Sequence, residues 1–133
     1  MGIYLNPNNV NFYNAVHDDI YVDKTSMIDF TNGCLNKSSR FMCVSRPRRF
    51  GKSIAAAMLA AYYSKGCDSR ELFKVLDIEM MPSFESELNK NNVIYIDISQ
   101  FRSKANVTGE LATLDLIQKT VIEELSFAEE NVR

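Results

Sequence analysis

The chain has 133 residues, which suits one domain, and 46% of them are hydrophobic, which is enough for a buried core. The net charge is −2 with 24% charged residues, so the chain as a whole is not a polycation built to bind nucleic acid. Three cysteines without a C-x-x-C pair and a single histidine argue against a disulfide framework and against a structural zinc site. Reduced thiols and the absence of a signal-peptide pattern or a membrane-length apolar run favour the cytoplasm, with no membrane partner.

The first third of the chain is predicted to be loop and short helix. Residues 1–19 are polar and rich in asparagine, with one helical turn expected at 12–16. The lone histidine, His17, is expected on the surface beside two aspartates. A helix is expected to begin at Asp23, whose side chain can cap it, and to end near Gly33.

A strand, a loop and a helix are predicted next. Residues 41–44 are apolar and bounded by a polar loop and a proline, which is typical of a buried central strand in a parallel sheet. Cys43 is therefore expected in the core. The alanine-rich residues 52–63 predict a helix that can pack closely on a sheet, with Gly66 as its left-handed cap.

The last third of the chain adds a second strand and more helices. Short helices are predicted at 68–71 onward and at 82–89, where Pro82 occupies the first turn. Residues 93–98 form the second apolar strand, and a helix is expected from about 108 to 124 or beyond. A long helical crossover separates the two strands, so they should be parallel. We therefore expect an α/β fold with a parallel sheet.

The sequence Arg-Pro-Arg-Arg-Phe-Gly-Lys-Ser at 46–53 indicates a phosphate-binding loop. Gly51, Lys52 and Ser53 match the end of the pattern G-x-x-x-x-G-K-[ST], whereas Arg46 stands where the pattern has its first glycine. Backbone N–H groups and the N-terminus of the following helix would converge on phosphate oxygens. Lys52 would supply charge to the terminal phosphates and Ser53 a hydroxyl for Mg²⁺, so ATP and Mg²⁺ are the expected cofactors.

The neighbouring residues leave two interpretations open. Arg48, Arg49 and Phe50 complete the candidate cofactor-binding set, and the arginines could neutralise phosphates. They could equally point to solvent or pair with acidic neighbours. The segment could also be an ordinary strand-to-helix turn with a basic surface.

Asp97 is the candidate for a metal-site acid, because it ends an apolar run as a Walker B aspartate does. No acidic residue follows it, since position 98 is isoleucine. The alternative is that Asp97 caps a turn at the end of the strand. No catalytic residue is assigned.

A series of segments follows the chain: Tyr21-Val22-Asp23-Lys24-Thr25, Ser45 to Ser53, Met58-Leu59, Tyr62-Tyr63, Leu72-Phe73 and Val93-Ile94-Tyr95-Ile96-Asp97. Taken together, these segments resemble the bacterial predicted AAA-ATPase-like family, over roughly residues 10–100. The block at 46–53 resembles that family's own form of the P-loop, in which the first glycine of the general pattern is also absent. The resemblance implies a P-loop NTPase-like three-layer α/β domain with a parallel sheet, truncated at its C-terminal side. In this fold Gly51, Lys52 and Ser53 would contact phosphate and Mg²⁺, and residues 21–24 would border the nucleotide.

Members of this family usually continue into an acidic Walker B strand and a restriction-endonuclease-like domain. The resemblance thus implies that residues 1–133 are a single, partial N-terminal AAA-ATPase-like P-loop domain, with a nuclease-like module as a C-terminal partner and the acidic pair beyond Arg133. The expected function is ATP binding, as part of an ATPase that drives a conformational change. The alternatives are a non-hydrolysing nucleotide- or anion-binding scaffold for protein or nucleic-acid interaction, and a small-molecule kinase.

Overall fold

The computed structural model describes residues 2–104 and 110–130, and in this part of the chain the regular structure is helical. Seven α-helices and two 3₁₀-helices (η) follow one another through the described residues. Their bounds are α1 Val10–Val16, α2 Ser26–Cys34, η1 Ser38–Arg40, α3 Lys52–Tyr63, α4 Arg70–Phe73, η2 Asp77–Met80, α5 Phe84–Glu87, α6 Ile98–Lys104 and α7 Glu110–Glu130.

The predicted parallel sheet is wrong, because the described residues contain no strand. Residues 41–47 have no regular secondary structure, no described segment pairs with them as a strand, and Phe41 is 81% exposed. Cys43 is exposed too, so its predicted place in the core is wrong. An apolar run becomes a buried strand only where another segment supplies hydrogen bonds and side chains to cover it.

The second predicted strand, 93–98, is replaced by a short extended segment with a different partner. Leu5 forms a single antiparallel bridge with Ile94. Two flanking bonds extend the contact, since Tyr95 N–H donates to the Tyr4 carbonyl at 2.8 Å and Asn6 N–H donates to the Val93 carbonyl at 2.7 Å. The prediction also ran one residue too far, because α6 begins at Ile98.

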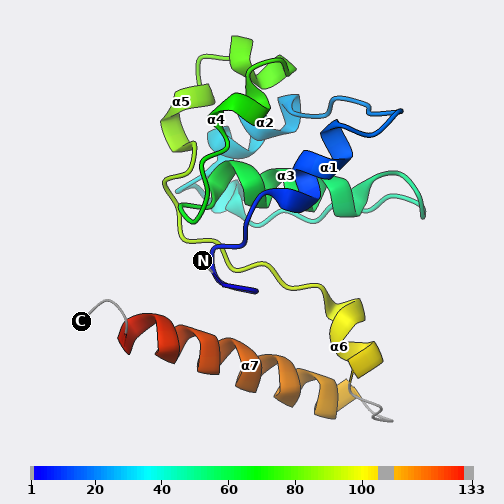
Figure 1. Cartoon of the computed structure of the whole chain (residues 1–133), viewed down its shortest axis with the longest axis vertical. Helices are drawn as coiled ribbons and strands as arrows, with labels where there is room; N and C mark the ends of the chain where they lie inside the picture. Colours follow the sequence, from blue (N-terminus) through cyan, green and yellow to red (C-terminus); the bar gives the residue numbers. More distant parts are fainter. Residues whose placement is uncertain (1, 105–109, 131–133) are drawn as a thin grey trace.

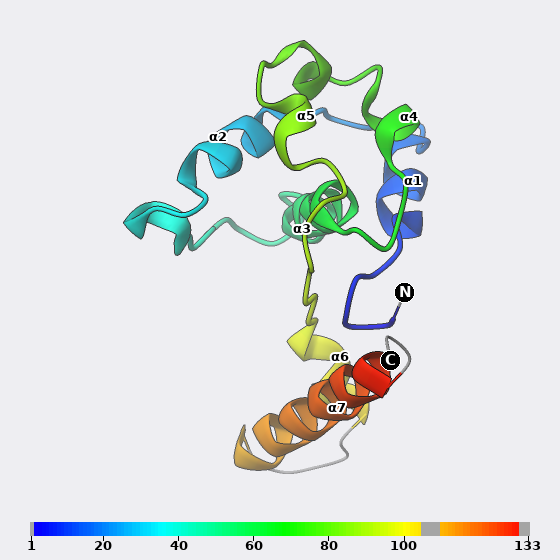
Figure 2. The same cartoon turned by 90° about the vertical axis from the view of Figure 1, so that its left-hand side faces the viewer.

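The core is built around α3. Figure 2 looks along this helix and shows α1, α2, α4 and α5 arranged around it. Met58, Ala61 and Tyr62 point from α3 into the core, and the Tyr62 hydroxyl donates to the Phe84 carbonyl at 2.7 Å. The buried residues that form this core cluster are Phe12, Ile28, Met58, Ala61, Tyr62, Phe73, Leu76, Ile78, Phe84 and Leu88.

The helix predicted over 52–63 is confirmed, but its C-terminal cap is not the predicted one. Gly66 does not adopt the left-handed conformation, and the helix ends in the extended residue Ser64. Asn89, from a later segment, donates from Nδ2 to the carbonyls of Ala61 and Ser64 at 2.9 and 2.8 Å. A side chain distant in sequence thereby satisfies carbonyls that the helix end leaves unpaired. Gly66 instead lets the backbone of Asn6 approach, because a Cβ there would lie 2.5 Å from the Asn6 carbonyl oxygen.

Helices α6 and α7 lie apart from the core helices, beside the N-terminal segment (Figure 1). Phe101 of α6 is buried and its ring lies 5.3 Å from that of Tyr4. Glu124 of α7 accepts hydrogen bonds from the backbone N–H groups of Tyr4 and Leu5. The N-terminal segment therefore contacts both α7, through Glu124, and the extended residues 93–95, through backbone hydrogen bonds.

The other predicted helices exist with shifted ends. The turn expected at 12–16 is α1, the helices expected near 68–71 and 82–89 are α4 and α5, and the last is α7, of which the described part begins at Glu110. Asp23 does not cap α2 directly: its Oδ1 accepts from Thr25 N–H at 2.8 Å and its Oδ2 from Asp77 N–H at 2.7 Å. His17 is exposed, as predicted, and stacks on Tyr13.

Candidate phosphate-binding site

The candidate site lies at the N-terminal end of α3. Residues 41–50 are exposed throughout, and Gly51 is the N-cap of the helix. Gly51 has a φ of 78°, a left-handed conformation that glycine adopts without the steric cost a Cβ would add. The first helical bond that the structure shows here runs from Ala55 N–H to the Gly51 carbonyl, at 2.9 Å. The amides of residues 52–54 precede it, so they are the groups that a helix N-terminus offers to an anion.

Lys52 lies in the first turn of α3 and its ammonium folds back over the loop. It donates to the carbonyl of Arg46 and, at 2.9 Å, to that of Pro47. A cation in the first turn opposes the helix dipole, and this turn has no acidic side chain to offset it. The side chain is exposed, so an anion at the helix N-terminus would compete with two loop carbonyls for the ammonium.

A second lysine contacts the same loop. Lys24 precedes α2 in the chain, and its ammonium donates to the Phe50 carbonyl at 2.7 Å. A Cβ built on Gly51 would lie 3.0 Å from this nitrogen, so the lysine sits directly against the glycine. We did not predict this contact from the sequence. The family resemblance implied only that residues 21–24 border the nucleotide, and it assigned no role to Lys24.

The side chains of the remaining loop residues are exposed to solvent. Arg48 and Arg49 are exposed, and neither forms a salt bridge within the described residues. Arg49 has a φ of 65°, an uncommon conformation for a residue with a side chain. Phe50 is 58% exposed. The loop thus carries four basic residues, Lys24 adds a fifth, and residues 46–53 include no acidic side chain, which makes the local potential positive.

Ser53 follows Lys52 in the first turn of α3 and is exposed. Its hydroxyl is the only side-chain oxygen in residues 46–53. The described residues include no cluster of three or more acidic, histidine or cysteine side chains arranged to hold a metal ion. Any cation at Ser53 would therefore take most of its oxygen ligands from a bound phosphate and from water.

The structure does not bring Asp97 to this loop. Its Oδ1 accepts from the backbone N–H of Ser99 at 2.9 Å and from the Ser99 hydroxyl at 2.6 Å, which caps the start of α6. These hydrogen bonds hold the pKa of the Asp97 carboxyl below its usual range. Asp97 lines a cavity of about 390 Å³ beside the N-terminal segment, and no residue of that cavity lines the one at the loop. The turn-capping alternative is thereby supported.

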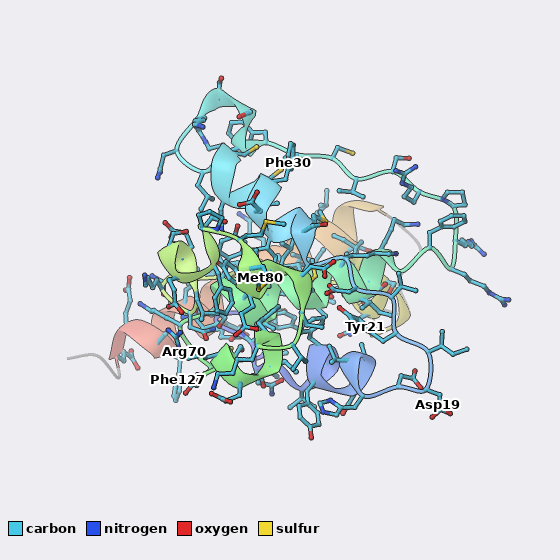
Figure 3. The ribbon with its side chains drawn as sticks, turned by 90° about the horizontal axis from the view of Figure 1, so that it is seen from above. Asp19, Tyr21, Phe30, Arg70, Met80 and Phe127 are labelled. Carbon is cyan, nitrogen blue, oxygen red and sulfur yellow. The ribbon has the colours of Figure 1, made fainter. Side chains whose placement is uncertain are left out.

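Tyr21 lies between the candidate site and the core. Figure 3 shows it nearer to the centre of the molecule than Asp19, which lies at the rim. Its ring meets that of Phe12 edge to face at 6.1 Å. Burial, and then the negative charge of Asp23, raises the pKa of Tyr21 to about 12, so the phenol is neutral at physiological pH. Residues 21–24 and 49–55 lie side by side, because both segments line one cavity and Lys24 donates to the Phe50 carbonyl.

The fold and site together describe a helical protein with a Gly-Lys-Ser loop at the start of its central helix. Residues 10–132 match the model of the family described as predicted AAA-ATPase, and the chain belongs to that family. No curated protein and no solved structure matches the chain. Among the described residues, no helix combines the length and apolar character required to cross a membrane.

Proposed function

We propose that this chain binds ATP through the loop at 46–53, with Lys52 as the principal phosphate-binding side chain. The observation that carries the proposal is the position of Lys52 in the first turn of α3, where a positive charge is unfavourable unless an anion binds there. The phosphates would lie against the amides at the start of the helix. Membership of the predicted AAA-ATPase family supports the same class of ligand.

The other loop residues have defined roles in this proposal. Gly51 lets the backbone approach the phosphates, and Ser53 contributes its hydroxyl to Mg²⁺ bound by the phosphate oxygens. Arg48 and Arg49 are exposed and have no salt bridge in the described part of the chain, so each is free to neutralise phosphate charge. Phe50 contributes its carbonyl, which holds Lys24 in the site.

Calorimetric titration of the 133-residue chain with ATP, with and without Mg²⁺, tests the proposal. Lys52→Ala should weaken ATP binding at least tenfold, which corresponds to about 1.4 kcal/mol. Lys65→Ala is the matched control, because Lys65 is also an exposed lysine but follows the opposite end of α3. Its affinity should stay within about twofold of the unmodified chain, since a distant surface charge contributes little. Equal affinities for Lys52→Ala and the unmodified chain would rule the phosphate loop out.

The position of Asp97 favours binding without turnover in this chain. Phosphoryl transfer depends on a group that orients the attacking water and on acidic ligands for the metal. Asp97 lines a different cavity, and its Oδ1 is used to cap α6. We propose that the nucleotide acts here as a bound ligand that stabilises the conformation of the loop. Hydrolysis would need acidic residues at the loop that the described part of this chain does not supply.

A phosphate-release assay separates these two roles. The unmodified chain should release phosphate from Mg-ATP no faster than Lys52→Ala does, because positioning groups supply orders of magnitude in rate. Asp97→Asn should leave this background rate unchanged. Mg²⁺-dependent release that is lost in Asp97→Asn would contradict binding without turnover, whereas the calorimetric result on Lys52 would still stand.

A further inference from the structure

A cavity of about 390 Å³ lies beside the N-terminal segment, and it is separate from the candidate phosphate loop. This volume is within the range of about 300–1,000 Å³ that small-molecule sites occupy. Its walls come from the N-terminal segment, which runs between the core and α7 (Figure 1), from the start of α1, and from the chain around the start of α6. The described residues that line it are Gly2, Ile3, Tyr4, Pro7, Asn8, Val10, Asn11, Tyr95, Asp97 and Gln100.

This cavity carries negative charge. Asp97 is the one charged side chain among its described lining residues, and it forms no salt bridge in the described part of the chain. Hydrogen bonds from Ser99 hold the pKa of its carboxyl below the usual range, so the group is ionised at neutral pH. Glu124 lies directly behind Gly2, because a Cβ built on this glycine would overlap the Glu124 carboxylate. Two carboxylates without a cationic lining residue make the potential here negative.

The neutral side chains of the wall add hydrogen-bond acceptors and aromatic surface. Each of Asn8, Asn11 and Gln100 has an amide oxygen that can accept a hydrogen bond. Tyr95 is half-buried, and burial, then the charge of Asp97, raises the pKa of its hydroxyl, so the phenol is neutral at physiological pH. The faces of tyrosine rings attract cations. The wall is therefore complementary to a positively charged group with N–H donors.

The inner end of the cavity is apolar. A smaller cavity of about 20 Å³, room for roughly one water-sized group, adjoins it, and Asn11 and Tyr95 line both. The smaller cavity is also lined by Ala57 and Ala60 of α3, the helix that packs against α1. The two cavities together run from the carboxylate of Asp97 to the small side chains of α3. This shape suits a charged head group followed by a short carbon chain.

We propose that this cavity binds a small organic cation: a primary ammonium or guanidinium group on a short carbon chain. Its N–H groups donate to the Asp97 carboxylate and to the amide oxygens around it, in charge-assisted hydrogen bonds that are stronger than neutral ones. Its carbon chain lies against Tyr95 and the alanines of α3. A metal ion fits less well, because the described residues offer no group of three acidic, histidine or cysteine ligands. The inference is independent of the proposed function, since no described lining residue belongs to the phosphate loop.

Titrations of the whole chain followed by heteronuclear NMR test this site with ligands that share a short alkyl chain. n-Butylamine and n-butylguanidine are cations at neutral pH, as the lysine and arginine side chains are, whereas n-butanol is neutral and pentanoate is an anion. At least one cation should bind about tenfold more tightly than n-butanol, and pentanoate should not bind. The tighter cation identifies the head group. The proposal is overturned if n-butanol binds as tightly as both cations, if neither cation binds, or if only amides outside the cavity wall shift.

The variant Asp97→Asn separates the charge of the cavity from its fold. Asparagine keeps an oxygen that can accept from Ser99 N–H, so the cap of α6 is retained while the negative charge is lost. This change should weaken binding of the tighter cation about tenfold and leave n-butanol within about twofold. Asp19→Asn is the matched control, because Asp19 is exposed at the rim of the molecule (Figure 3) and does not line the cavity. Equal cation affinities in the two variants would contradict the proposal.

A variant that gains affinity excludes a purely structural effect. Gln100→Glu adds a second carboxylate to the cavity wall and should strengthen cation binding about threefold, the effect of one exposed ion pair. Gln118→Glu makes the same change at an exposed position of α7 that does not line the cavity, and it should leave the affinity unchanged. If Gln100→Glu binds the cation no more tightly than Gln118→Glu does, the proposed role of the negative charge is wrong.

Discussion

The two ends of α3 differ in almost every physical respect. At the C-terminal end, Ala61 and Tyr62 are fully buried, and Asn89 caps the last carbonyls of the helix. At the N-terminal end, the ten residues before Gly51 are all exposed, and the loop is held chiefly by hydrogen bonds from Lys24 and Lys52. One helix thus joins a packed core to a weakly constrained basic loop. The comparison indicates that stability and anion binding depend on separate residues.

The largest expected effect is at the packed end. Phe73 is fully buried, stacks on Phe12 at 5.1 Å and meets Tyr62 edge to face at 5.7 Å. Phe73→Ala should lower the free energy of unfolding by about 3–5 kcal/mol, through lost burial and a new cavity. Phe50→Ala, in the exposed loop, should change the free energy of unfolding by no more than about 0.5 kcal/mol. Urea unfolding followed by circular dichroism measures both, and similar losses would show that the loop is part of the core.

Substitution of alanine for two glycines, Gly51 and Gly33, should change the stability of the protein in opposite directions. Gly51→Ala places a Cβ at a φ of 78° and 3.0 Å from the Lys24 ammonium, which should cost about 1–2 kcal/mol. Gly33 lies inside α2, and a Cβ there meets nothing within 4 Å. Gly33→Ala should therefore stabilise the protein by about 0.5–1 kcal/mol.

Urea midpoints and ATP affinity distinguish the two glycine variants. Gly51→Ala should also weaken ATP binding, because the strain lies in the loop itself, whereas Gly33→Ala should leave it unchanged. A Gly51→Ala chain with normal stability and normal affinity would contradict the requirement for a left-handed residue at the start of α3.

The smallest expected effect is a pH-dependent change in stability that arises from Tyr63, which packs against the core. The Tyr63 hydroxyl donates to Asn32 Oδ1 at 2.7 Å and lies 2.7 Å from the Thr31 hydroxyl, and burial raises the pKa of Tyr63 to about 12. Tyr63→Phe should cost about 1 kcal/mol at neutral pH, since Asn32 loses its donor.

The sign of the pH effect follows from the raised pKa. Between pH 10.0, the ordinary tyrosine value, and about 12, the unfolded chain loses the Tyr63 proton while the folded chain keeps it. The stability from this group is therefore complete below pH 10.0 and is lost as the pH rises toward about 12. Tyr63→Phe removes this contribution, so the difference in stability between the two proteins should be constant below pH 10.0 and narrow between pH 10.0 and about 12. A constant difference in urea midpoints across that range would show that Tyr63 titrates normally in the folded protein.

The helices could be predicted from the sequence, and the sheet could not. Residues 52–63 are rich in alanine, which favours helix at every position regardless of neighbours, and the predicted helix matches α3. The apolar runs at 41–44 and 93–98 carry the same local pattern as buried strands. The described residues supply no partner for the first and only a short antiparallel one for the second. A strand depends on a second segment in space, so its pattern alone was misleading.

By itself, the sequence determined the local features: the Gly-Lys-Ser motif, the helix that follows it and the basic charge around it. These depend on residues within a few positions of one another, where hydrogen bonding and helix propensity act directly. The tertiary structure alone decided that Lys24 contacts the loop, that Asn89 caps α3 and that Asp97 lies at another cavity. Each of these joins segments far apart in the chain, and such contacts follow from how the helices pack around α3 and not from any local pattern.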